Sequence, residues 1–273
     1  MLELLDHPLF QGGVAPFAVA LVVALTFAHT RFAWLAIILA YATMTALDTG
    51  FSLFPPTVAR KTMLVGLLSP LVGIVADTYP RWSGRIAAAL VVTAGLLSIW
   101  VFLTVLQNRD GSNAVVAGAG MAAFVAALIA VMLRLRDDGL RCGAAGLGLG
   151  LAVGIAGILS ASIGALIEGT AIAAACGAML IAQIVLSRAF AAGFAGALPI
   201  GMLAALIAAG TQQLALLPWY ALPMLLLIPV AVSLPAPTRG SFIARAAVPA
   251  GYALAAAVIP VGAAWYAAHG TLF

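Results

Sequence analysis

Apolar runs of about 20 residues, separated by short polar breaks, follow one another along almost the whole chain. A bilayer core takes about 20 apolar residues per helical span, and backbone groups in lipid must find their hydrogen bonds within the protein. The composition agrees, because 65% of the 273 residues are hydrophobic and 7% are charged. The predicted fold class is therefore an all-α polytopic membrane protein, a helical bundle without a soluble domain.

The polar breaks divide the chain into ten predicted spans within a single transmembrane domain, residues 1–273. The breaks at Glu168-Gly169-Thr170 and Thr211-Gln212-Gln213 are weak, so eight or nine spans remain the alternative. The predicted spans are 12–29, 31–54, 61–77, 84–106, 114–133, 142–166, 170–187, 190–211, 214–234 and 245–267.

Basic side chains predict how the bundle is oriented. The connections after spans one, three, five, seven and nine hold nine Lys and Arg residues, whereas the other connections hold three. Because Lys and Arg favour the cytoplasmic side, we expect the first set inside and both termini on the non-cytoplasmic side. The expected location is multi-pass in the bacterial inner membrane, with the lipid bilayer as partner. The cations are scattered over short loops, so no nucleic-acid partner is predicted.

The second connection and its flanks carry the strongest candidate site. Asp48 lies about 9 Å inside the predicted end of span two. Arg60 and Lys61 follow it on the side that cations usually avoid. Glu168, at the predicted outer end of span six, is expected at the same level. An ionisable group within a span is by default a candidate for substrate or proton binding. The alternatives are a fixed salt bridge for Asp48 and a solvated turn for Glu168.

Further polar residues extend this candidate site. Thr45 and Ser52 lie three residues before and four residues after Asp48, which places them on its helix face. Gln183 lies midway along span seven. A lone glutamine in a span more often forms an interhelical hydrogen bond than a ligand contact.

A faint internal repeat links the two halves of the chain, residues 1–137 and 138–273. The segment RKTMLVGLLSPLVG opens span three, and SRAFAAGFAGALPIG opens span eight, with Pro70 and Pro199 at similar distances from the leading base. Five spans per half would give two inverted halves, as in many secondary transporters, and proline breaks would then border a central site. Chance similarity in an Ala, Gly and Leu-rich chain is the alternative.

Patterns for other chemistry are missing from the sequence. Cys142 and Cys176 have no partners at ligand spacing, so we predict buried packing residues, with no metal and no other cofactor. Gly146, Gly150 and Gly154 follow the small-xxx-small pattern of close helix packing rather than that of a phosphate-binding loop. No nucleophile, base and orienting group occur together, so enzyme activity is not expected.

Two functions therefore lead, with a membrane enzyme third. The preferred one is an integral membrane secondary transporter or carrier for a small solute, ion or lipid, proton-coupled through Asp48. Its site would be bordered by Asp48, Arg60, Lys61 and the proline breaks. The alternative is a non-catalytic accessory subunit of a larger membrane complex, in which glycine faces and sparse charges serve assembly with membrane protein partners.

Overall fold

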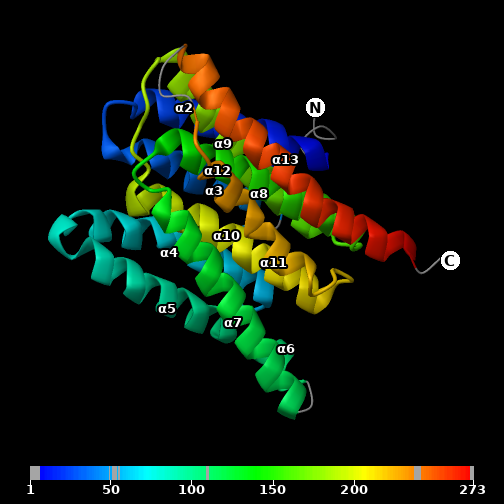
Figure 1. The fold of residues 1–273 in the computed structure, drawn as a ribbon. Coiled ribbons are helices and arrows are strands. Elements are labelled where there is room, and N and C mark those ends of the chain that lie inside the picture. Colours follow the sequence, from blue (N-terminus) through cyan, green and yellow to red (C-terminus); the bar gives the residue numbers. More distant parts are fainter. Residues whose placement is uncertain are drawn as a thin grey trace.

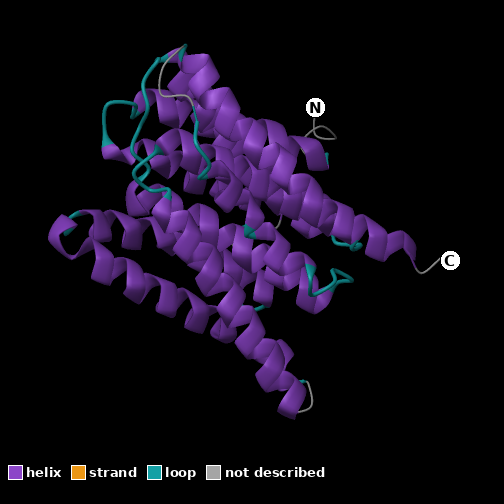
Figure 2. Ribbon diagram, in the orientation of Figure 1, coloured by secondary structure: helices purple, strands orange, loops and turns teal. Residues whose placement is uncertain are grey.

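The described part of the chain is helical throughout. The computed structural model describes residues 7–48, 50, 54, 56–108, 111–236 and 241–270, and these ranges contain no strand (Figure 1 and Figure 2). Helices satisfy their backbone hydrogen bonds internally, as apolar sequences of this kind require. The prediction of an all-α bundle is confirmed.

Seven helices within the described ranges are long and apolar enough to cross a membrane. One of them, α5 (Ser83–Val101), is preceded by the short turn η3 (Pro80–Trp82) and followed by α6 (Leu103–Gln107). The seven helices are α4 (Val58–Asp77), α5 (Ser83–Val101), α7 (Gly111–Arg134), α8 (Gly139–Leu159), α9 (Ile163–Val185), α10 (Gly193–Leu214) and α13 (Phe242–His269).

Three shorter apolar segments coincide with the remaining predicted spans. Each is shorter than the roughly 20 residues of a full span, so the ten-span arrangement stays a prediction. The segments are η1 (Phe10–Val14) with α2 (Ala15–Thr26), η2 (Arg31–Trp34) with α3 (Leu35–Asp48), and α11 (Ala221–Leu225) with α12 (Leu227–Val232).

The glycine stripe of α8 packs against α9, as predicted. A Cβ at Gly150 would overlap the backbone of Gly169 and Ala173, so only glycine permits this approach. Cys142 and Cys176 lie in the same pair of helices, and both are free thiols without exposed surface. The prediction that they are buried packing residues is confirmed.

The turn between α8 and α9 lies at residues 160–162, and not at Glu168-Gly169-Thr170 where the sequence indicated a break. Ser160 Oγ donates to the Ala156 carbonyl (2.7 Å), and Ser162 Oγ accepts from Ala165 N (3.3 Å). These serines satisfy the two helix ends, so the chain reverses without a longer polar break. Glu168 therefore lies inside α9, and its prediction as a turn residue is wrong.

The central helix α10 runs antiparallel to α4. Gly66 of α4 lies against Leu203, and Gly73 lies against Ala195. These two contacts fix the register of the pair, so that Pro70 and Pro199 lie at the same level. Both prolines are buried within their helices. The two helices that carry the suspected repeat are thus direct neighbours, with their proline breaks side by side.

The connections rich in Lys and Arg gather at one end of the bundle, which we call the basic face (residues 27–34, 78–85, 134–141, 186–192, 233–236 and 241–245). Hydrogen bonds join its loops. Arg188 Nη1 donates to His29 Nδ1 (3.0 Å), and Arg141 Nη1 donates to the Ser233 carbonyl (2.9 Å). Figure 1 shows α13 running from this face to the other side of the molecule.

The other end, which we call the opposite face, carries the connections at residues 160–162 and 215–220. They touch through a hydrogen bond from Leu216 N to the Ser160 carbonyl (3.3 Å). The described helices thus alternate in direction between two faces, and the basic face holds most of the cations.

Candidate functional site

Glu168 and Tyr41 form the polar centre of the candidate site. The Tyr41 hydroxyl of α3 donates a long hydrogen bond to Glu168 Oε1 of α9 (3.5 Å). Tyr41 is buried, with 2% of its surface exposed. Glu168 lies about 8 Å along α9 from its first residue, at 1.5 Å per residue. A carboxyl group thus enters the bundle with a neutral hydroxyl as its hydrogen-bonding partner.

The end of α3 adds a second acid to this centre. Asp48 is exposed and is the last residue of α3, seven residues after Tyr41. Gln11 is buried and donates through Nε2 to the Leu47 carbonyl (3.2 Å), which fixes the end of the helix. Asp48 therefore lies about two helical turns beyond Tyr41 on α3, at the exposed end of the helix.

A pocket of about 240 Å³ lies beside Glu168 at the opposite face. It is bounded by the start of α4, the α8–α9 turn and the end of α10. Liquid water occupies about 30 Å³ per molecule, so the volume suits a solute of a few heavy atoms. The wall is apolar apart from one carboxyl and three hydroxyl groups. These polar lining residues are Glu168, Thr62, Ser162 and Thr211.

The basic residues of the predicted site are not among the residues that line this pocket. Lys61 Nζ donates to the Trp100 carbonyl of α5 (3.3 Å) and lies 5.1 Å from the centre of the Trp100 ring. Among the described residues Lys61 forms no ion pair with Asp48. Lys61 bonds the Trp100 carbonyl at the end of α5 instead of the Asp48 carboxylate. Arg60 is half-buried in the first turn of α4, and its backbone N–H is bonded to Thr57 Oγ1 (3.4 Å).

Three other residues of the predicted site, Thr45, Pro70 and Pro199, have different surroundings. Thr45 is buried and donates to the Tyr41 carbonyl in its own helix (3.0 Å). Ser52 lies outside the described residues. Pro70 and Pro199 meet at the crossing of α4 and α10, deeper in the bundle than the pocket lining.

Gln183 is a loop anchor at the basic face. Its Oε1 accepts from Phe190 N (3.0 Å), and its Nε2 donates to the Met179 carbonyl of its own helix (3.3 Å). The side chain has no exposed surface. Gln183 therefore holds the connection that leads into α10. Neither of its two contacts is the interhelical hydrogen bond expected from the sequence.

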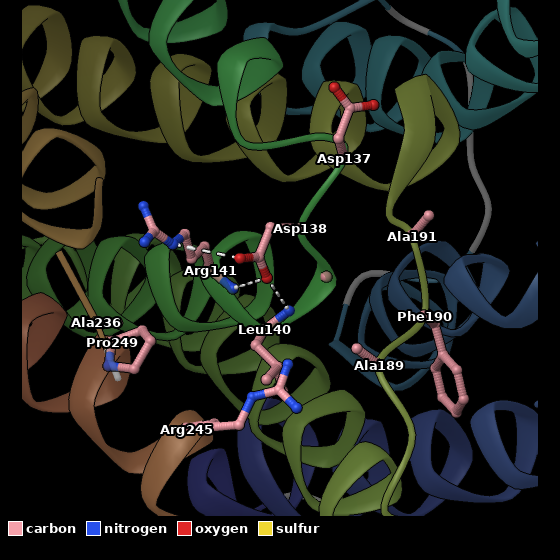
Figure 3. Close-up of a pocket in the computed structure, with 11 residues that line it drawn as sticks. Asp137, Asp138, Leu140, Arg141, Ala189, Phe190, Ala191, Ala236, Arg245 and Pro249 are labelled. Carbon is pink, nitrogen blue, oxygen red and sulfur yellow. Dashed lines mark hydrogen bonds and ion pairs between the residues drawn. The ribbon is translucent and has the colours of Figure 1, made fainter. Parts of the chain in front are cut away.

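A second polar pocket of about 400 Å³ lies at the basic face (Figure 3). Asp138 caps α8 by accepting from Leu140 N (3.1 Å) and Arg141 N (3.2 Å), and it pairs with Arg141 Nε (3.2 Å). Asp137 is exposed and pairs with Arg136 at 3.7 Å. Each of these two acids therefore pairs with an arginine that lies within three residues of it in the sequence.

Sequence reasoning missed two important residues. Tyr41 lies four and seven residues before Thr45 and Asp48, so helical periodicity would have placed it on the same face. Asp77, at the end of α4, accepts from Phe194 N (2.9 Å) and Ala195 N (3.2 Å) at the start of α10. This contact joins distant segments, and no local pattern indicates it.

The chain matches no protein family model and no curated protein. The geometry of the two faces is therefore the basis for a functional proposal.

Proposed function

We propose that the protein is a secondary transporter that carries a small solute or ion and is coupled to protons through Glu168. The observation that carries this proposal is the position of Glu168. Its carboxyl lies inside a helical bundle, bonded to a neutral hydroxyl, and borders a solute-sized pocket open at one face. Ionisable groups in such positions are typical of proton relays and substrate sites.

The Tyr41 hydroxyl suits a group that changes its protonation state. A phenol donates a hydrogen bond to an ionised carboxylate and accepts one from a protonated carboxyl. Tyr41 can therefore stay bonded to Glu168 in both states. We infer that Asp48, at the exposed end of α3, serves as the group through which protons pass between bulk water and Glu168.

The pocket chemistry favours a neutral or cationic substrate. Glu168 lines it, Asp48 ends the neighbouring helix α3, and Lys61 contacts α5 instead. An anion would be repelled by these carboxylates, whereas hydroxyl groups from three elements can bond a polar solute.

Membrane placement is part of the proposal. We infer that the three shorter apolar segments also cross, which gives ten spans, with the basic face in the cytoplasm and both termini outside. The bacterial inner membrane is the location that we propose. The Glu168 pocket then opens away from the cytoplasm.

The proline-containing pair α4 and α10 suggests how the pocket could change sides. The two helices run antiparallel with Pro70 and Pro199 at one level, as expected if the two halves of the chain are inverted repeats. Asp77, Gln183 and the bond from Gly193 N to the Arg136 carbonyl (2.8 Å) close the basic face around the start of α10. We infer an outward-open state, and release of these contacts would open the cytoplasmic side.

Charge movement in proteoliposomes tests this function. Concentration jumps of amino acids, amines, polyols and monovalent cations should produce transient currents for at least one class. Glu168→Gln should abolish them, because the amide cannot exchange a proton. Asp137→Asn is the matched control, since Asp137 is 91% exposed at the basic face, and it should behave as wild type. Wild-type, pH-dependent currents in folded Glu168→Gln protein would refute the proposal.

A further inference from the structure

A further cavity, distinct from the Glu168 pocket and the basic-face pocket, opens between α4 and α5. It has a volume of about 470 Å³, and its floor is formed by Leu198 and Met202 of α10. Its rim includes Leu68 and Val72 of α4, which are 49% and 46% exposed. The lining is almost wholly apolar. We call this cavity the α4–α5 groove.

Lys61 lies at one end of the α4–α5 groove. Its ammonium group is next to Trp100, whose side chain lines the groove, while Leu64 and Val65 continue the wall one helical turn further. Lys61 is 9% exposed. An ammonium group has three donor hydrogens. Among the described residues one acceptor is bonded to it, the Trp100 carbonyl.

This combination defines the chemistry of the ligand. A buried cation is costly unless charged or polar acceptors surround it, so an anionic oxygen at Lys61 would stabilise this end. From Leu64 to Val72 the groove follows α4 for about 12 Å at 1.5 Å per residue. A ligand that fits both parts has a negative head and a long apolar chain.

We propose that the α4–α5 groove binds an anionic phospholipid, with a headgroup phosphate at Lys61 and an acyl chain along α4 and α5. Both helices are long and apolar enough to cross a bilayer, so the groove faces lipid tails. The site also accounts for the position of Lys61 on the side where cations are rare. It needs membrane placement of α4 and α5, and it is independent of the Glu168 pocket.

Fluorescence quenching of Trp100 tests the site. The full-length protein is reconstituted in mixtures of phosphatidylglycerol and phosphatidylcholine, in which one or the other carries brominated acyl chains. The Trp100 signal is the difference between wild type and Trp100→Phe. Brominated phosphatidylglycerol should associate about fivefold more strongly than brominated phosphatidylcholine, the preference expected for one lysine near anionic lipid.

Variants that change the charge at Lys61 or the shape of the groove distinguish a specific lipid-binding site from ordinary boundary lipid. Lys61→Met should abolish the preference, and Lys61→Arg should keep it. Val72→Phe should reduce quenching by filling the groove. Val92→Phe is its matched control, since Val92 is 62% exposed on α5 and does not line the groove.

Equal quenching by both lipids in wild type would overturn the proposal, as would a preference unchanged in Lys61→Met. If Lys61→Met does not fold, the pair Val72→Phe and Val92→Phe decides, and equal quenching in these two variants would show boundary lipid only.

Discussion

The acids of the pockets at the two faces differ in their hydrogen-bonding partners. At the basic face Asp138 is bonded to two backbone N–H groups and to Arg141, which follows it by three residues. At the opposite face Glu168 is bonded to one phenol, contributed by a helix distant in sequence. The first arrangement fixes a charge in place. The second gives the carboxyl no charged partner among the described residues, and the proposed proton coupling rests on this difference.

Cysteine labelling from one side of the membrane should distinguish the two pockets completely, because we propose that they open on opposite sides. Gly164→Cys lines the Glu168 pocket at a position with open space for a side chain, and Ala191→Cys is exposed in the basic-face pocket. In intact cells a membrane-impermeant maleimide should label Gly164→Cys, and should label Ala191→Cys only after permeabilisation. Native Cys142 and Cys176 are fully buried, so the background should be low.

Labelling of both positions from the same side would contradict the alternation of the helices between two faces. It would also remove the basis for an outward-open pocket.

The next largest effect is expected at Asp77, which joins α4 to α10. Asp77→Ala removes a charged acceptor from Phe194 N and Ala195 N, and should lower the free energy of unfolding by about 2 kcal/mol. Denaturation by SDS, followed by circular dichroism, measures the loss. Asp77→Asn keeps one oxygen acceptor and should lose less. Equal stability of wild type and Asp77→Ala would show that the contact does not hold the basic face closed.

Asp138→Ala should have a smaller effect, limited to stability. The variant loses the cap of α8 and the pair with Arg141, with an expected cost of about 1 kcal/mol. Transient currents should stay at the wild-type level, since Asp138 is fixed by its partners. If the currents disappeared while the protein remained folded, the basic-face pocket would have a role in transport.

The smallest predicted effect comes from Tyr41→Phe. The hydroxyl makes one long hydrogen bond, so its removal should slow proton-coupled transport about threefold and barely change stability. Initial rates in proteoliposomes measure this change. Thr43→Val in the same helix is the control and should not alter the rate, because among the described residues Thr43 Oγ1 bonds only the Leu39 carbonyl of its own helix (2.8 Å).

Particular residues show where sequence reasoning reached the site and where it failed. Asp48 and Glu168 are predicted at one level from their positions in the apolar runs, and the Tyr41–Glu168 bond brings α3, which ends at Asp48, against α9. Lys61 was expected to meet Asp48 but bonds the Trp100 carbonyl. The distance along the chain made Asp48 the nearest acid, whereas the packing of α5 on α4 offered a closer acceptor.

The sequence by itself determined the helical class, the positions of most apolar helices and the collection of cations into alternate connections. These properties depend on local hydrophobicity and on helical geometry, which act over a few turns. The tertiary structure alone decided that Tyr41 reaches Glu168, that Asp77 caps α10 and that Pro70 lies beside Pro199. Those pairings depend on how closely helices approach, and small residues such as Gly66, Gly73 and Gly150 set that approach through contacts between segments far apart in the chain.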